Sequence, residues 1–155
     1  MSPFAWHLAI GSGILISAAL FAILPALRIQ WLLDRRRKAA SRFRLRREWL
    51  EVAFTPLLTK RLQARGLTLA HLDFDDAFAL VRERSTRRLQ ALVGVTIAFS
   101  DAAETQAANT DLVTTRRATA VFRLEKGRWT TDGRLLLSPG PADALRQFAK
   151  DLSPF

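Results

Sequence analysis

The 155-residue chain contains no cysteine and only two histidines, His7 and His71. Without thiolates it cannot build a disulfide framework, a thiolate zinc site, an iron–sulfur cluster or a cysteine nucleophile. Two histidines exclude a multi-histidine metal centre. No serine has a credible His–Asp partner set, and no glycine-rich phosphate loop of the dinucleotide or Walker type is present. The sequence therefore predicts a protein that is not an enzyme and that has no resident metal or cofactor.

Formal charge is missing altogether between Phe4 and Leu27, a run of 24 residues. A helix of that length reaches about 36 Å, which exceeds a hydrocarbon core of about 30 Å. Trp6 and Trp31 suit aromatic anchors at the two interfaces, and Arg28 can snorkel back to the headgroups. A cleaved signal peptide fits poorly because the basic residues follow the apolar run instead of preceding it. We expect a retained single-pass anchor.

The twenty residues after this run are strongly basic. Only one acid, Asp34, interrupts nine lysines and arginines, which are Arg28, Arg35, Arg36, Arg37, Lys38, Arg42, Arg44, Arg46 and Arg47. Flanks of this kind stay on the cytoplasmic side during insertion. The expected topology in an inner membrane, of the cytoplasmic or thylakoid type, is a short N-terminus outside and everything after Arg28 inside.

The net charge of +10 belongs mainly to this basic collar. Residues 48–155 hold 15 basic and 13 acidic side chains, a net of only +2. A juxtamembrane collar is attracted to an anionic leaflet, at about 1 kcal/mol per residue near the surface. The expected partners are therefore the anionic inner leaflet and other subunits of a membrane complex, with no specific nucleic acid.

Three segments follow from these patterns: an anchor over 1–33, a basic juxtamembrane helix over 34–54 and a cytoplasmic α+β domain over 55–155. Gly13 and Ser17 form a small-xxx-small pair in the anchor, a spacing that lets two helices pack closely. Thr55-Pro56 predicts a helix break, and Gly66 predicts the end of the next helix. Two apolar groups recur at helical spacing, one containing Phe43, Leu50, Phe54, Leu57 and Leu58, the other Leu45, Trp49 and Val52.

Alternating apolar residues predict four strands in the domain. The clearest covers 89–99, it is preceded by one over 77–84, and a second pair covers 118–124 and 129–137. Short turns at 85–88 and 125–128 make each pair a hairpin, and 100–115 reads as a long polar loop between them. Pro141 starts a last helix whose apolar stripe reaches Leu152.

The predicted fold is thus α+β, with helices on one face of a four-stranded antiparallel sheet and a likeness to cystatin-like and nuclear-transport-factor-like folds at the level of analogy. The other face is expected to be wet or to serve as an interaction face. Its polar side chains are Gln90, Thr96, Thr119, Thr130 and Arg134.

Acidic residues cluster only at Asp73, Asp75 and Asp76, just after His71. Such oxygen ligands could hold Mg²⁺ or Ca²⁺, but the segment lacks the glycine and distal glutamate of a calcium loop. Asp132-Gly133 reads as a bulge or turn. Capping and turn roles are the favoured interpretation of all four carboxylates.

The segments 90–99, 118–122 and 128–134 resemble parts of a family of uncharacterised, membrane-anchored proteins of photosynthetic microbes and their relatives, over about residues 71–150. Family members carry a longer acidic, glycine-containing loop in place of 101–114. The resemblance implies an accessory role in a membrane complex and no known activity.

The sequence therefore predicts a non-catalytic accessory, assembly or scaffolding subunit of a photosynthetic or bioenergetic membrane complex. Two alternatives remain open. One is a protein that binds anionic lipid through its arginine collar. The other is a cone-shaped ligand-binding or catalytic domain that uses Asp73, Asp75, Asp76 or Asp132.

Overall fold

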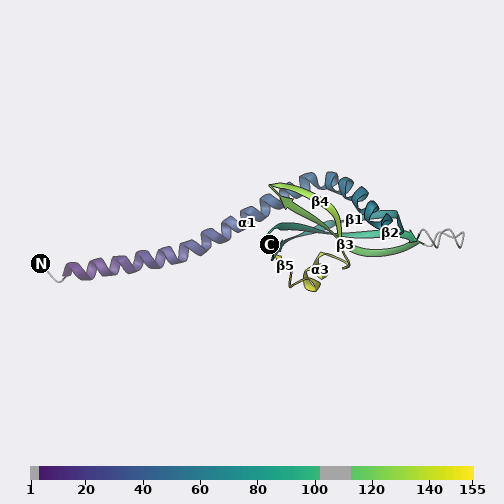
Figure 1. Cartoon of the computed structure of the whole chain (residues 1–155). Helices are drawn as coiled ribbons and strands as arrows, with labels where there is room; N and C mark the ends of the chain where they lie inside the picture. Colours follow the sequence, from purple (N-terminus) through teal and green to yellow (C-terminus); the bar gives the residue numbers. More distant parts are fainter. Residues whose placement is uncertain (1–3, 102–112) are drawn as a thin grey trace. The chain divides into compact units, whose positions relative to one another are not determined.

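The computed structural model describes residues 4–101 and 113–155, and for residues 4–29, Leu32 and Asp101 it describes the backbone alone. The chain divides into two compact units, Met1–Ala39 and Ala40–Phe155, and the second holds the sheet (Figure 1). In the part of the chain whose side chains are described, no helix is long and apolar enough to cross a membrane. The side chains of the proposed anchor, 4–27, lie outside that part, so the anchor stays a prediction.

Helix α1 (Phe4–Gln63) is continuous, and the expected break at Thr55-Pro56 is wrong. Proline removes one backbone donor, so the carbonyl of Val52 loses its helical partner. Val52 and Pro56 are both exposed, however, so this carbonyl lies on the side of the helix that water reaches. Thr55 Oγ1 donates to the carbonyl oxygen of Glu51 at 3.0 Å. Packing of the opposite face then keeps the helix intact up to Gln63. A turn follows over residues 64–66, and Gly66, with φ of +75°, lies just past the helix end as predicted.

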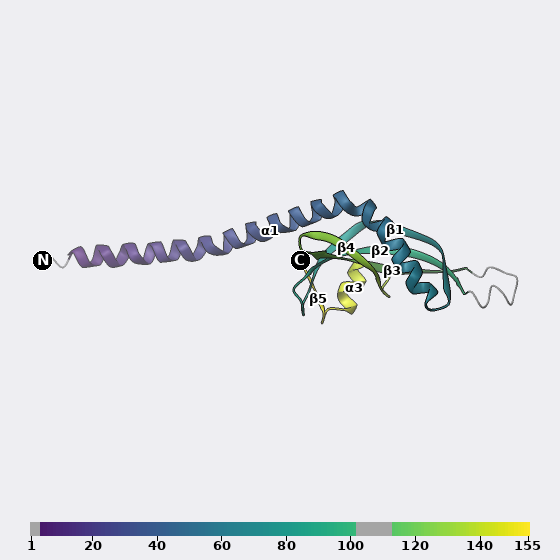
Figure 2. The same ribbon diagram turned by 45° about the horizontal axis from the view of Figure 1, so that its top comes forward.

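Within the second unit, α1 has two different faces. Phe43, Leu50, Phe54 and Leu58 are buried against the sheet, as their spacing predicts, whereas Leu57 of the same predicted group is 39% exposed. The second apolar group, Leu45, Trp49 and Val52, faces solvent. Figure 2 shows this part of α1 running across the sheet.

The sheet is antiparallel and has five strands in the order β4-β3-β2-β1-β5. The strands are β1 (Leu67–Glu83), β2 (Leu89–Asp101), β3 (Val113–Glu125), β4 (Arg128–Leu136) and β5 (Leu152–Pro154). The α+β class and the antiparallel pairing are confirmed, but the prediction of four strands in two hairpins is wrong. Strand β1 starts ten residues before the expected strand, β2 pairs with β3 along its length, and β5 was not expected.

Tight turns connect the strands where the sequence predicted them. Between β1 and β2 the chain turns at Arg87, with φ of +56°. Between β3 and β4, Lys126 and Gly127 both have positive φ, +48° and +79°, the backbone geometry that suits the twist of a two-residue hairpin.

Two bulges interrupt the pairing on either side of the central strands. In β1, the register passes from Phe74 opposite Val95 to Phe78 opposite Val93, so three residues oppose Gly94. In β4, the register passes from Thr131 opposite Phe122 to Leu135 opposite Ala120, around Gly133 with φ of +70°. The bulge predicted from Asp132-Gly133 is therefore confirmed. Bulges bend and twist a strand, and α1 contacts both of them.

An aromatic core fills the space between α1 and the sheet. The Phe43 ring lies 4.9 Å from Phe78, 5.5 Å from Phe122 and 5.1 Å from Trp129 between centroids. The Phe54 ring lies 5.5 Å from Phe122. Centroid separations of this size at tilted angles are favourable for aromatic pairs. These contacts join α1 to strands β1, β3 and β4, so the helix is part of the domain core.

The opposite face of the sheet is also covered, which corrects the expectation of helices on one face only. Helix α3 (Pro141–Gln147) packs there, together with the side chain of Leu152 from the edge strand β5 (Figures 1 and 2). This second core consists of Val81, Leu92, Val121, Leu136, Ala144 and Leu152, with Leu145 and Phe148 against it. The predicted last helix is shorter than expected, since Leu152 belongs to β5. Gln90 and Thr119, predicted on a wet face, are only 2% and 0% exposed.

Candidate functional site

The four carboxylates considered for chemistry do not converge. Asp73, Asp75 and Asp76 lie on β1, whereas Asp132 lies on β4. Strands β2 and β3 lie between them, and neighbouring strands of a sheet are about 4.8 Å apart. Asp75 pairs with Arg117 at 2.9 Å, and Asp132 pairs with Arg123 at 3.2 Å. Among the described residues, no group of three potential ligands is placed to hold a metal ion. Asp75 and Asp132 are therefore engaged in ion pairs on different strands of the sheet.

Arg47 of the basic collar is engaged inside the sheet domain. Its Nη1 and Nη2 donate to the backbone carbonyl oxygens of Asp76 and Asp75, both at 2.5 Å, and its Nε donates to Glu51 at 2.6 Å. The two carbonyls belong to the β1 bulge, where ladder partners are missing. Arg44 lies over the Phe78 ring at 5.6 Å. These two predicted membrane-interface arginines therefore help to hold α1 on β1.

The rest of the collar reaches solvent where the structure describes it. Trp31 is 56% exposed, and Arg35 stacks on its ring at 4.0 Å. The other exposed collar residues are Arg36, Arg37, Lys38, Arg42 and Arg46. Trp6, Gly13, Ser17 and Arg28 lie outside the residues whose side chains are described.

The predicted interaction face is not a continuous polar surface. Thr96 and Thr130 are half-buried and Arg134 is exposed, but Thr119 bonds to the carbonyl oxygen of Ser138 at 3.0 Å under the strand-to-helix connection. Gln90 lines a small cavity of about 110 Å³ beside Phe148 and Leu152. Its Nε2 has no hydrogen-bond partner among the described residues. Burial of two of the five residues removes this face as a single docking surface.

An exposed apolar stripe lies on the outer face of α1. Leu45 is 84% exposed, Trp49 is 62% exposed and Val52 is 73% exposed. Their spacing of four and three residues places all three on one side of the helix, opposite Phe43 and Leu50. We call Leu45, Trp49 and Val52 the outer stripe.

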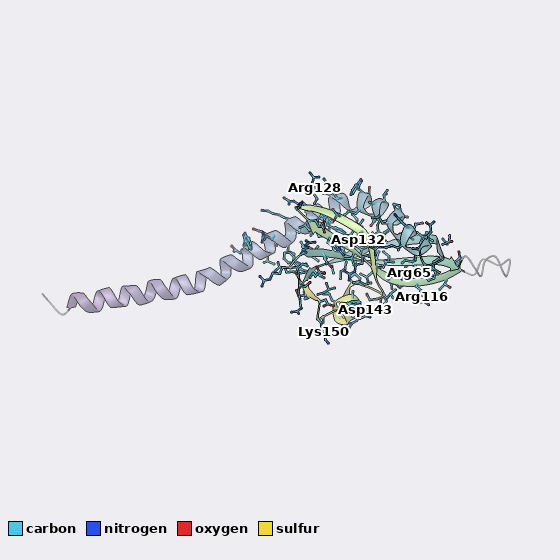
Figure 3. The ribbon with its side chains drawn as sticks, viewed as in Figure 1. Arg65, Arg116, Arg128, Asp132, Asp143 and Lys150 are labelled. Carbon is cyan, nitrogen blue, oxygen red and sulfur yellow. The ribbon has the colours of Figure 1, made fainter. Side chains whose placement is uncertain are left out.

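A basic hollow of about 260 Å³ adjoins the outer stripe. Arg42, Leu45 and Arg46 of α1 line it from one side, and Gly127, Arg128 and Trp129 line it from the β3–β4 turn. Figure 3 shows Arg128 beside α1. Three guanidinium groups at one depression favour acidic ligands, because planar guanidinium donors match carboxylate and phosphate geometry.

A larger cleft of about 390 Å³ lies at the other end of α1, between its last turns and strands β2, β3 and β4. Figure 3 shows Arg65 and Arg116 at this end of the domain, with Asp143 and Lys150 near α3. Sequence reasoning missed both the cleft and the hollow. Each is lined by residues from elements that are distant in sequence, and no periodicity marks such combinations.

No known family model, curated protein or solved structure matches this chain. The predicted resemblance to membrane-anchored proteins of photosynthetic microbes stays a prediction.

Proposed function

We propose that this protein is a non-catalytic accessory, assembly or scaffolding subunit of a membrane protein complex. A single span over 4–27 would anchor it, with the N-terminus outside and the sheet domain on the cytoplasmic side. The observation that carries the proposal is the outer stripe on α1, because it exposes a tryptophan and two aliphatic residues together on a rigid element.

Exposed tryptophan is unusual on a surface that has no partner. Tryptophan and arginine are the residues that most often dominate binding energy at protein interfaces. The outer stripe has Trp49 at its centre and Arg42, Arg46 and Arg128 beside it. We infer a partner segment with an apolar patch for Trp49 and acidic side chains for the basic hollow.

The outer stripe lies on a part of α1 whose opposite side is fixed to the sheet. Phe43, Leu50 and Phe54 fix the opposite side of α1 in the aromatic core, and Arg47 ties the helix to the β1 bulge. A surface held in this way loses little conformational entropy when it binds a partner. This rigidity suits a scaffolding role.

The first experiment is site-specific photo-crosslinking in native membranes. Full chain with benzoylphenylalanine at position 49 should give one adduct of defined mass, and the same group at Thr86, on the exposed β1–β2 turn, should give none. The adduct should disappear when Arg42, Arg46 and Arg128 are changed to Gln. A chain that crosslinks to nothing at position 49 and migrates alone in mild detergent would contradict the proposal.

A second experiment compares stoichiometric co-purification. The variant with Leu45, Trp49 and Val52 changed to Ser should lose the partner that the wild-type chain retains. Val113→Ser is the control, because Val113 is an exposed aliphatic residue that lies on β3 and does not belong to the outer stripe. Equal retention by both variants would show that the outer stripe does not bind the partner.

A lipid surface is the second candidate, since the outer stripe and the basic residues beside it also suit an anionic leaflet. The absence of cysteine allows a spin label at Trp49→Cys alone. In nanodiscs, the label should then enter the bilayer only when anionic lipid is present, and about 1 M salt should reverse this insertion. Such a result would favour a lipid surface as the partner. A label that stays in water in every lipid composition would favour a protein partner at the outer stripe.

A further inference from the structure

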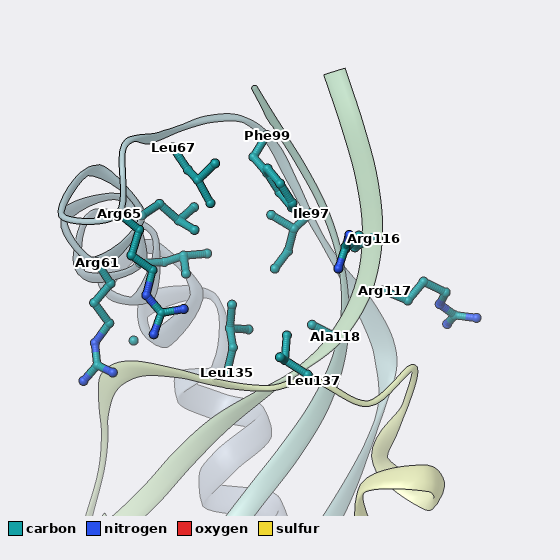
Figure 4. A pocket seen from close by; sticks show the side chains of 13 residues that line it. Arg61, Arg65, Leu67, Ile97, Phe99, Arg116, Arg117, Ala118, Leu135 and Leu137 are labelled. Carbon is teal, nitrogen blue, oxygen red and sulfur yellow. The ribbon is translucent and has the colours of Figure 1, made fainter. Parts of the chain in front are cut away.

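The cleft at the C-terminal end of α1 has apolar walls. Leu58 and Leu62 contribute from α1, Ile97 and Phe99 from β2, and Leu135 from β4. Figure 4 shows Ile97, Phe99 and Leu135 around one common space. A cavity of about 390 Å³ is within the range of small-molecule sites, which runs from about 300 to about 1,000 Å³.

Three guanidinium groups border this apolar space. Arg61 comes from the last turn of α1, Arg65 from the turn that follows it, and Arg116 from β3. In Figure 4, Arg116 lies beside the cavity and Arg117 is directed away from it. This agrees with Arg117 pairing with Asp75 on the other face of the sheet.

The charges at the border are only partly compensated. Arg61 pairs with Asp132 at 3.6 Å, and that carboxylate is shared with Arg123. Arg65 and Arg116 form no ion pair with any described residue. Among the described residues that line the cleft, basic side chains therefore border a floor of hydrocarbon, and none of the lining residues is acidic.

Close packing of α1 on β4 forms one side of the cleft. A side-chain carbon at Gly133 would lie 2.8 Å from Cβ of Leu57, so only glycine allows this approach. Gly133 and Leu58 both line the cleft. The wall is thus set by the domain core and does not depend on an exposed loop.

We propose that this cleft binds a single-chain lipid with an anionic head, its acyl chain between the apolar walls and its head on Arg65 and Arg116. A sugar or nucleotide would leave its polar groups unpaired against leucine, isoleucine and phenylalanine. A cationic amphiphile would be repelled by the arginines. A carboxylate or a phosphate head can each accept paired guanidinium donors, so both belong to the proposed class. This site is independent of the outer stripe.

The test uses the full chain in phosphatidylcholine nanodiscs and a palmitate that carries a diazirine near the end of its chain. After irradiation, mass spectrometry should place the adducts on Ile97, Phe99 or Leu135. Changing Arg65 and Arg116 together to Gln should lower the adduct yield about tenfold, because hydrogen bonds to a charged head are lost. Both side chains are exposed, so the variant should keep its fold.

Arg84→Gln, on the exposed turn after β1, is the matched control and should label like the wild type. Leu135→Trp fills the cleft without removing charge and should also abolish labelling. Excess palmitate or lysophosphatidate should compete, and which competes at lower concentration identifies the head. Any of three results would overturn the proposal. Methyl palmitate could compete as well as palmitate, the double arginine variant could be labelled as strongly as the wild type, or all adducts could lie outside the cleft.

Discussion

Arg47 Nη2 lies 2.5 Å from the backbone carbonyl oxygen of Asp75, across the junction of α1 and the β1 bulge. Asp75 is thus held through its backbone by one arginine and through its carboxylate by another, Arg117. The bulge leaves carbonyls without ladder partners, and the guanidinium supplies the missing donors. A residue of the basic collar has in this way become part of the fold.

Arg47→Met should lower the free energy of unfolding by about 2–3 kcal/mol. The apolar stem is kept, but hydrogen bonds from a charged donor to two carbonyls are lost. Denaturant unfolding of the full chain in neutral detergent, followed by near-ultraviolet circular dichroism, measures the change. Arg36→Met, at an exposed position of the same helix, should stay within about 0.5 kcal/mol of the wild type. Equal effects of the two substitutions would show that Arg47 does not hold the bulge.

Gly133→Ala should destabilise the domain more than Gly127→Ala. Both glycines have positive φ, +70° and +79°, so both substitutions cost about 1 kcal/mol of backbone strain. Only at Gly133 would the new Cβ meet Leu57, whereas nothing lies within 4 Å at Gly127. Overpacking should add about 1–3 kcal/mol, so thermal unfolding should separate the two variants clearly. Similar melting temperatures would mean that α1 can move away from β4 at little cost.

Gly94→Ala should act mainly through Asp75. A Cβ at position 94 would lie 2.2 Å from Oδ2 of Asp75, the atom that pairs with Arg117. The carboxylate must then move, and the ion pair, which is largely exposed, contributes no more than about 1 kcal/mol. In a double-mutant cycle with Asp75→Ala, the cost of Gly94→Ala should fall to about zero. Strict additivity of the two substitutions would show that they do not interact.

Gln90→Met should raise the free energy of unfolding by about 1 kcal/mol. Gln90 is 2% exposed and its Nε2 has no partner among the described residues, so the wild type carries an unpaired buried donor. Methionine has a similar shape and no such donor. Urea denaturation of the full chain in neutral detergent measures the gain. A loss of stability would instead indicate a buried water bound to the amide in the small cavity.

Strong local patterns predicted much of the sheet domain. Alternation over 89–99 gave β2, and Lys126-Gly127 gave the β3–β4 turn, because both depend on neighbours in sequence. The buried side of α1 was visible as the spacing of Phe43, Leu50, Phe54 and Leu58. The opposite side, Leu45, Trp49 and Val52, was also visible as a second group at helical spacing.

The errors have specific physical causes. Aspartates favour turns, so the first half of β1 was not recognised, although a bulge accommodates Asp75 and Asp76 within the strand. Pro56 normally ends a helix, but here the lost hydrogen bond is on the exposed side and aromatic packing holds the other side. Gln90 and Thr119 read as surface residues because the segments beside them are short and irregular: Ser138 bonds to Thr119, and Phe148 and Leu152 lie beside Gln90. The cleft and the hollow depend on tertiary contacts alone.

The aromatic core also sets an order of events during synthesis. Phe43 and Phe54 are translated long before Trp129 and Phe122, the rings that cover them. At translation speeds of about 5–20 residues per second, the apolar side of α1 is synthesised on the order of ten seconds before the strands that cover it. Throughout that interval a nascent chain would present both sides of an amphipathic segment to chaperones, so slower elongation between codons 63 and 129 should increase its aggregation.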